Sequence, residues 1–171
     1  MTSRFSLAVL ALAVVPSVAV AQAPVADALR ANTKQYGKNL SAAAEVMPAD
    51  KYAFKPTSAQ MSFGDVVTHL IEGNDYLCGL LGGTQAPTRT KVTATDKKEA
   101  LVTRLKETFA FCDQALATLD DSKLGEQVSL FGMKMSRAGA EMLTVGDWAD
   151  HYSQMANYLR LNGQLPPTAK K

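Results

Sequence analysis

The chain of 171 residues has only two histidines, His69 and His151, and Asp147 precedes the second by four positions. Residues four apart are neighbours on a helix surface, so Asp147 and His151 can reach one ion if their segment is helical. Two imidazole nitrogens, one carboxylate oxygen and an open fourth position suit a catalytic zinc ion, and the same donors suit iron, nickel or another divalent metal. Such an ion activates water or a bound thiolate, or polarises a carbonyl. The spacing alone is more typical of a solvated helix face, so the metal hypothesis requires the fold to bring His69 to the other two residues.

The last helix must position Asp147 and His151, and we predict it from Ser136 to Gly163, with Gly163 as its C-terminal cap. His151 lies about 100° from the centre of the predicted apolar arc. That arc consists of Met142, Val145, Ala149, Tyr152, Ala156 and Leu159, flanked by Trp148 and Met155. A narrow polar strip beside it carries Asp147, His151, Gln154 and Tyr158.

A second helix must position His69, and we predict it from Ser62 to about Leu81, before a pair of glycines. Ser62 followed three positions later by Asp65 is typical of a capping box. The apolar stripe of this helix consists of Phe63, Val66, Val67, Leu70, Leu77, Cys78 and Leu81. His69 lies off that stripe, and Gly73 beside it either leaves room for a ligand or is a helix defect that costs about 1 kcal/mol relative to alanine.

Two further amphipathic segments complete the expected fold. One helix is predicted over Val25–Val46, and another from Asp96, as its N-cap, to about Leu119. The stripe of the latter is Leu101, Leu105, Phe109, Cys112, Leu116 and Leu119. Residues Gln127–Phe131 are predicted as a short extended piece, with Gly132 in a turn. Four helices with one apolar stripe each can bury those stripes against one another, so we predict an all-α four-helix bundle.

The N-terminus has the pattern of a secretory signal peptide. Arg4 is followed by an apolar run, a proline and small residues up to Ala21. We therefore expect residues 1–21 to be a signal peptide and residues 22–171 to form one domain that is periplasmic or secreted, without stable membrane insertion after cleavage. The formal net charge is only +2, and the lysine and arginine residues are dispersed along the chain. Both features argue against nucleic-acid binding.

The two cysteines, Cys78 and Cys112, both fall within predicted apolar stripes. Two buried thiols and one disulfide are about equally compatible with these positions in an exported protein. A redox-active pair is disfavoured, because the chain has no Cys-x-x-Cys and no basic neighbour that would lower a thiol pKa.

Three segments of the chain resemble the DinB-like (YfiT-like) superfamily, and they look closest to a secreted group within it. They are "MSFGDVVTHLIEGNDYLC", "FAFCDQAL" and "DHYSQMANYLRLNGQLPP". The resemblance spans nearly the whole mature chain and implies a four-helix bundle that binds a divalent metal through three histidines. His69 and His151 match two of these ligands, whereas Asp147 stands where the family pattern has the third histidine. The resemblance also implies that Cys78 and Cys112 pair with each other.

The resemblance and the residues together suggest two functions. The first is metal-assisted hydrolysis or group transfer, including thiol-type transfer, on a small-molecule substrate that the sequence does not identify. Here Glu72 or Asp150 would accept a hydrogen bond from the ring N–H of a ligating histidine. The candidate groove-lining donors are Tyr76, Gln154 and Tyr158. The second is a metal-free binding or structural bundle with a degenerate site, and pairing of two copies as a homodimer is a further option.

Overall fold

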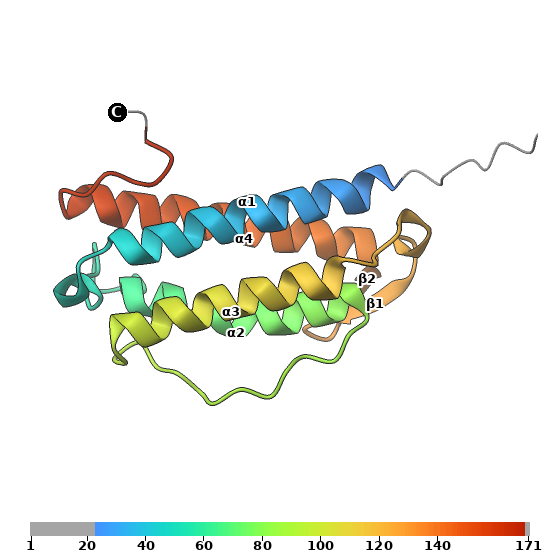
Figure 1. The fold of residues 1–171 in the computed structure, drawn as a ribbon, viewed down its shortest axis with the longest axis horizontal. Helices are drawn as coiled ribbons and strands as arrows, with labels where there is room; N and C mark the ends of the chain where they lie inside the picture. The colour runs from blue at the N-terminus through green and yellow to red at the C-terminus, as the bar shows by residue number, and fades with distance from the viewer. Residues whose placement is uncertain (1–22, 170–171) are drawn as a thin grey trace, which may run out of the picture.

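The computed structural model describes residues 23–169, which form a bundle of four helices with one β-hairpin (Figure 1). The helices are α1 (Pro24–Val46), α2 (Phe63–Gly82), α3 (Lys98–Leu116) and α4 (Arg137–Leu161), with short 3-10 turns at Ala49–Lys51 and Asp121–Lys123. Strands β1 (Gln127–Leu130) and β2 (Met133–Ser136) pair in antiparallel fashion between α3 and α4. The predicted all-α bundle is confirmed, although the second strand of the hairpin was not expected.

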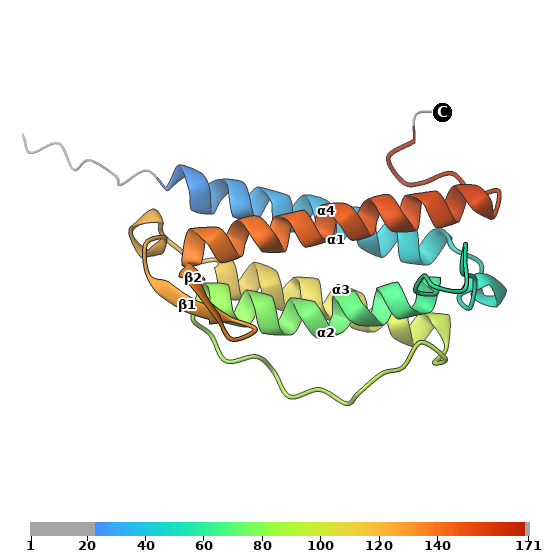
Figure 2. The same ribbon diagram turned by 180° about the vertical axis from the view of Figure 1, so that it is seen from behind.

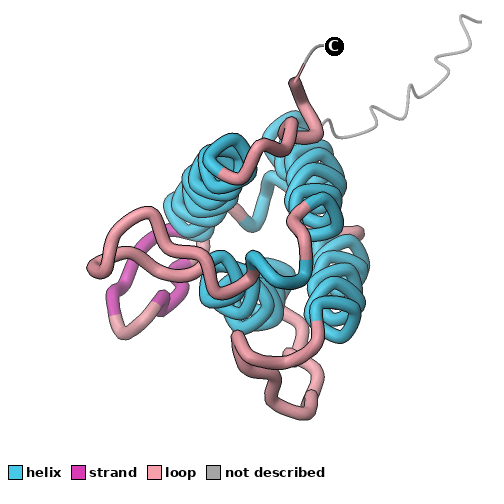
Figure 3. Tube along the Cα trace, turned by 90° about the vertical axis from the view of Figure 1, so that its left-hand side faces the viewer, coloured by secondary structure: helices cyan, strands magenta, loops and turns pink. Residues whose placement is uncertain are grey.

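The helices run in two directions. Helices α1 and α4 run one way and α2 and α3 the other, as the views from both sides show (Figures 1 and 2). Each of α1 and α2 packs against both α3 and α4, so the four helices form a square in the end-on view (Figure 3). Because α2 and α3 are parallel, residues 83–97 return along the outside of the bundle. Arg89 fastens this loop through its Nε–H, which donates to Asp75 Oδ2 over 2.6 Å.

The two predicted N-terminal caps had different outcomes. Ser62 caps α2 as expected: its Oγ accepts from the Asp65 backbone N–H at 3.1 Å, and the Asp65 carboxylate accepts from the Ser62 N–H at 3.0 Å. The Ser62 hydroxyl, which donates to Asp65 Oδ2 at 2.6 Å, and then the Ser62 N–H lower the pKa of Asp65. The Asp96 cap was wrong, because its carboxylate accepts instead from the Thr93 backbone N–H and α3 starts two residues later, after Lys97.

The apolar stripes of α2 and α3 are confirmed, whereas that of α4 was misplaced. Every residue predicted for the α2 and α3 stripes is buried. In α4, however, Met142 is 76% exposed, and the buried face is rotated by about 100° from the predicted arc. The residues on that face are Ala140, Glu141, Thr144, Trp148, His151, Met155, Ala156, Tyr158 and Leu159. Three of them are polar, which is why a pattern read from apolar residue types missed it. His151 therefore lies on the buried face and not at its flank.

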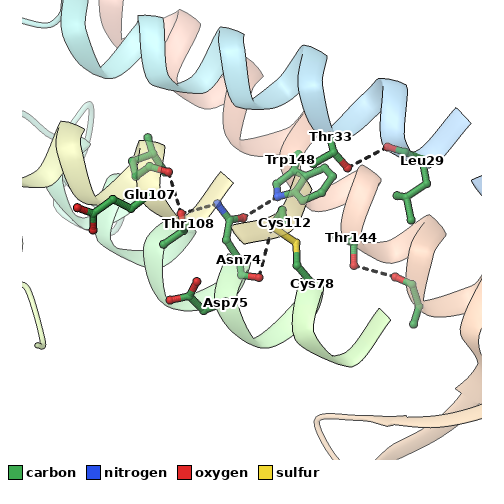
Figure 4. Close-up of a disulfide and its surroundings, with 12 residues drawn as sticks. Leu29, Thr33, Asn74, Asp75, Cys78, Glu107, Thr108, Cys112, Thr144 and Trp148 are labelled. Atoms are coloured by element: carbon green, nitrogen blue, oxygen red, sulfur yellow. Dashed lines mark hydrogen bonds between the residues drawn. A yellow bond between two sulfur atoms is a disulfide. The ribbon is translucent and has the colours of Figure 1, made fainter. Parts of the chain in front are cut away.

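A disulfide and a polar network join α2, α3 and α4 in the interior (Figure 4). Cys78 and Cys112 form a disulfide between α2 and α3, as expected from the family resemblance. Next to it, Asn74 donates to Thr108 Oγ1 at 3.0 Å and accepts from Trp148 Nε1–H at 2.8 Å. We call these five residues the Asn74 cluster.

Two further predictions concern the signal peptide and membrane insertion. The predicted signal peptide, residues 1–21, lies outside the described residues. Among helices within residues 23–169, none combines the length and apolar character needed to cross a bilayer.

Candidate metal centre

The fold brings together the three residues singled out for metal binding, which we call the His–Asp–His triad. His69 projects from α2 toward Asp147 and His151, one turn apart on α4. Asp147 Oδ1 lies 3.3 Å from His151 Nε2 and 3.9 Å from His69 Nε2. One potential ligand atom from each residue lies within 4.8 Å of the other two. The imidazole rings meet edge to face, with their centroids 4.8 Å apart.

The three side chains differ in burial. His151 is only 8% exposed, because it belongs to the buried face of α4. The side chains of Asp147 and His69 are 36% and 49% exposed. The triad is therefore anchored on one side in the bundle and open to solvent on the other, as a site that exchanges ligands must be.

A chain of hydrogen bonds fixes the proton on the far nitrogen of His151. The Tyr158 hydroxyl donates to the Met61 backbone carbonyl at 2.9 Å, so the same hydroxyl must accept from Gln154 Nε2 at 3.0 Å. The amide of Gln154 then presents Oε1 to His151 Nδ1 at 3.1 Å. An oxygen acceptor there requires a hydrogen on Nδ1. The neutral ring consequently keeps its Nε2 lone pair free, on the side that faces Asp147.

Asp147 also controls the charge of His151. Its hydrogen bond to the ring raises the pKa of His151 above the ordinary value, outweighing burial, which acts in the opposite direction. When the ring takes up its second proton, that proton lies on Nε2, in the position that a cation would take. Metal binding must displace that proton, so the two compete for one lone pair.

The donor set fits a small divalent cation. Tetrahedral zinc with bonds of about 2.0–2.1 Å separates its ligand atoms by about 3.3 Å. The pair formed by Asp147 and His151 already has this separation, and the pair formed by Asp147 and His69 exceeds it by 0.6 Å. The ligand atoms of the two histidines lie within 4.8 Å of each other, so the exposed His69 side chain must move inward to complete the site. Imidazole nitrogens suit zinc, iron and nickel, and two imidazoles with one carboxylate are a known donor set for iron(II).

The predicted outer partners of the triad were partly wrong. Gln154, and neither Glu72 nor Asp150, accepts the hydrogen bond from a triad ring. Glu72 instead points toward Lys91, 4.0 Å away. Asp150 acts on His151 only at a distance, by adding to the rise of its pKa.

The predicted groove-lining donors also have other roles. The Tyr76 hydroxyl accepts from the Phe131 N–H at 3.1 Å and lies 3.3 Å from the Ser129 carbonyl, so it braces the hairpin. Gln154 and Tyr158 line an open cavity of about 630 Å³ that contains none of the triad residues.

Sequence reasoning overlooked two features of this region. Asn74 has the helical spacing of a stripe residue between Leu70 and Leu77, and a polar residue at such a position is a signal for a buried hydrogen bond. The contact of the hairpin with α2 and α4 beside the triad had no comparable signal, because it joins segments distant in sequence.

Comparisons with known proteins agree with the fold. The sequence model described as the DinB superfamily matches residues 33–155, a range that contains the whole triad. A DinB-like protein from Bacillus subtilis has a similar structure, with a TM-score of 0.65 and 18% identity over 80% of this chain and 92% of that one. A DinB-like protein from Bacillus cereus has a TM-score of 0.69 and 13% identity over 84% of this chain and 97% of that one. No curated protein matches the chain.

Proposed function

This chain belongs to the DinB superfamily, and from that premise we propose that it is an exported protein whose His–Asp–His triad binds one divalent metal ion. The observation that carries the proposal is the convergence of donor atoms from α2 and α4 within 4.8 Å of one another. We propose further that the reaction is hydrolysis or group transfer, including transfer to a thiol, on a small molecule.

The protein residues have separate roles in this proposal. His69, Asp147 and His151 hold the ion, and the bound ion supplies a Lewis acid with an open position for water, a thiol or a carbonyl oxygen. Gln154 keeps the proton of His151 on Nδ1 and so keeps Nε2 available. Asp147 contributes a negative charge that offsets part of the charge of the cation and favours its capture over that of a monovalent ion.

Export is supported by two features of the chain. The N-terminal residues have the arrangement of a signal peptide, and the Cys78–Cys112 disulfide suits an oxidising compartment. We therefore propose a periplasmic or secreted location and a membership in the secreted part of the superfamily. A homodimer is compatible with this location, and light scattering of the mature protein tests it.

Metal titration tests the proposal directly. Mature protein purified without chelators is titrated with zinc, nickel and iron(II), and the bound metal is counted by elemental analysis. We expect one ion per chain for the wild type, and a loss of affinity of at least 100-fold for His151→Ala and for Asp147→Ala. Asp150→Asn is the matched control, because it removes a carboxylate charge from the same turn of α4 without removing a proposed ligand.

A competing function makes a different prediction. If Asp147 marks a degenerate site, the triad is a hydrogen-bonded cluster in a metal-free binding or structural bundle, supported by the raised pKa of His151. In that case wild type, Asp147→Ala and Asp150→Asn bind metal equally weakly, and the metal proposal is refuted.

A further inference from the structure

An apolar pocket adjoins the exposed side of the triad. It has a volume of about 260 Å³ and lies between α2, α4 and the hairpin. His69 and Asp147 form one wall, and the residues of the other walls are Gly73, Leu77, Leu130, Phe131, Met133, Leu143 and Thr144. Five of these are large hydrophobic side chains, so the pocket provides an apolar environment beside two polar groups. The larger cavity near Gln154 reaches none of the three donors, which makes the hairpin pocket the better candidate for a substrate.

The hairpin wall of this pocket is held in an unfavourable conformation. Phe131 has a φ of 50° and Gly132 a φ of 82°, so both residues of the two-residue turn are left-handed. Such turns favour asparagine or glycine in the first position, and a phenylalanine there is costly. Tyr76 maintains the conformation through its hydrogen bond with the Phe131 N–H and by stacking on the Phe131 ring, with ring centroids 5.0 Å apart.

This conformation leaves apolar surface uncovered. Phe131 is 70% exposed, and Met133 and Leu143 beside it are both more than half exposed. Backbone strain and exposed hydrophobic side chains that coincide at one place are typical of functional sites. The strain therefore has an explanation if the Phe131 ring contacts a ligand.

Gly73 sets the floor of the pocket. A Cβ added at Gly73 would meet only Leu77 Cδ1, at 3.9 Å, so the backbone packing does not require glycine there. Glycine in the middle of a helix is unfavourable relative to alanine. Its presence one turn from His69 is accounted for by the space that it leaves beside the triad.

The volume limits the size of the occupant. An apolar cavity of about 150 Å³ is large enough to hold benzene. A pocket of about 260 Å³ takes a somewhat larger group, on the order of 8–10 heavy atoms. A long acyl chain or a polycyclic ligand would extend beyond its walls.

We propose that this pocket binds the apolar part of the substrate, an aryl or compact branched-alkyl group, and that an oxygen or sulfur donor next to this group faces His69 and Asp147. The inference rests on the proposed metal site for the polar end of the ligand. The apolar end requires only the pocket, so the two parts can be tested separately.

The first experiment tests the pocket without metal. Benzyl alcohol is titrated into metal-free, nitrogen-15-labelled protein, and backbone amide shifts are followed by NMR. We expect saturable shifts centred on Gly73, Leu130 and Phe131, and a loss of affinity of at least ten-fold in Gly73→Leu, which fills the pocket. Gly146→Leu is the matched control, because a Cβ there meets nothing within 4 Å. Shifts that are absent, or that persist unchanged in Gly73→Leu, would overturn the inference.

The second experiment joins the pocket to the metal. Benzohydroxamic and acetohydroxamic acid carry the same chelating group on an aryl and a methyl group, and both are titrated into zinc-loaded protein. We expect benzohydroxamic acid to bind at least ten-fold more tightly to the wild type and less than three-fold more tightly to Gly73→Leu. Equal binding of the two acids to zinc-loaded wild type refutes the pocket and leaves the metal site standing. A wild type that binds no zinc refutes the metal site, and the first experiment still decides the pocket.

Leucine favours helix more than glycine does, so Gly73→Leu is expected to fold. Circular dichroism and zinc content are measured for each variant. A folded Gly73→Leu protein with wild-type zinc content assigns any loss of benzohydroxamic acid binding to the filled pocket.

Discussion

Two polar groups of residues share α2 only five positions apart, and they differ in how their hydrogen bonds are completed. In the Asn74 cluster, the amide of Asn74 is bonded on both sides, by Thr108 and Trp148, and the disulfide closes the neighbouring space. In the His–Asp–His triad, Asp147 shares a hydrogen bond with His151, but the side that carries His69 is open to solvent.

The difference separates a structural role from a binding role. A buried network whose donors and acceptors are all paired stabilises one arrangement of the helices and has no capacity left for a ligand. Donor atoms that converge on one point and remain open to solvent on one side have that capacity. Substitutions in the Asn74 cluster should therefore change stability and leave metal affinity alone, whereas substitutions in the triad should do the reverse.

Removing the disulfide should have the largest effect on stability. The bond closes a loop with a sequence separation of 34, for which chain entropy predicts about 3–4 kcal/mol of stabilisation. We expect Cys78→Ala with Cys112→Ala to lower the free energy of unfolding by this amount in urea titrations followed by circular dichroism. The zinc affinity of the folded fraction should stay within about three-fold, because neither cysteine contacts the triad. A parallel loss of zinc affinity would contradict the separation of the two groups.

Replacing Asn74 should have the next largest effect. Asn74→Leu leaves the buried Trp148 Nε1–H without an acceptor, which costs about 2 kcal/mol. The double variant Asn74→Leu with Trp148→Phe removes that unpaired donor. It should be less destabilised than the sum of the single variants, as a double-mutant cycle measured by urea denaturation can establish. Strictly additive effects would show that the hydrogen bond between these residues does not matter.

The same contrast explains what could be predicted from the sequence. The stripes of α2 and α3 consist of large apolar residues at helical spacing, so their burial and the bundle follow from the hydrophobic pattern. The face of α4 could not be obtained in this way, because Thr144, Glu141 and His151 occupy buried positions and Met142 is exposed. Which side of α4 faces α2 is decided by tertiary packing around Trp148.

The candidate site was predictable in its residues and not in its surroundings. The scarcity of histidine and the four-residue spacing of Asp147 and His151 single out the three triad residues from the sequence alone. Gln154 is connected to Met61 through the Tyr158 hydroxyl, and this connection joins segments far apart in the chain. The apolar hairpin wall likewise depends on distant segments. No local pattern encodes such contacts, so only the three-dimensional structure reveals them.

Glu141 is a buried polar residue that belongs to neither the Asn74 cluster nor the triad. Substituting it measures what a buried polar group without a hydrogen-bond partner costs in stability. Its Oε1 is buried without a hydrogen-bond partner, and burial raises the pKa of the carboxyl group. The raised pKa means that the folded state favours the protonated form. The stability due to Glu141 is therefore complete below the pKa of the unfolded chain, near 4.3, and is lost as the pH rises through the higher folded pKa.

We expect Glu141→Gln to raise the free energy of unfolding by about 1 kcal/mol at pH 7, because glutamine keeps the shape and never carries the charge. The gain should disappear near pH 4. Urea denaturation at both pH values measures it, and Glu72→Gln on the exposed face of α2 is the control, with no change expected at either pH. A gain that is independent of pH would exclude ionisation of Glu141 as its cause.

The smallest effect is expected from Tyr158→Phe, which weakens the triad without touching it. The Tyr158 hydroxyl determines which end of the Gln154 amide faces His151. Without it, the amide can turn, and its NH2 group then favours the His151 tautomer with hydrogen on Nε2, which cannot bind a metal. If half of the molecules adopt that form, the apparent zinc affinity falls about two-fold, and a larger share lowers the affinity by up to about five-fold.

Nitrogen-15 shifts of the His151 ring in neutral, metal-free protein report the tautomer directly. Tyr152→Phe is the matched control, since its hydroxyl bonds Thr168 in the segment after α4 and not Gln154. An unchanged tautomer in Tyr158→Phe would show that Gln154 is held by other contacts and that the relay to Met61 has no influence on the metal ligand.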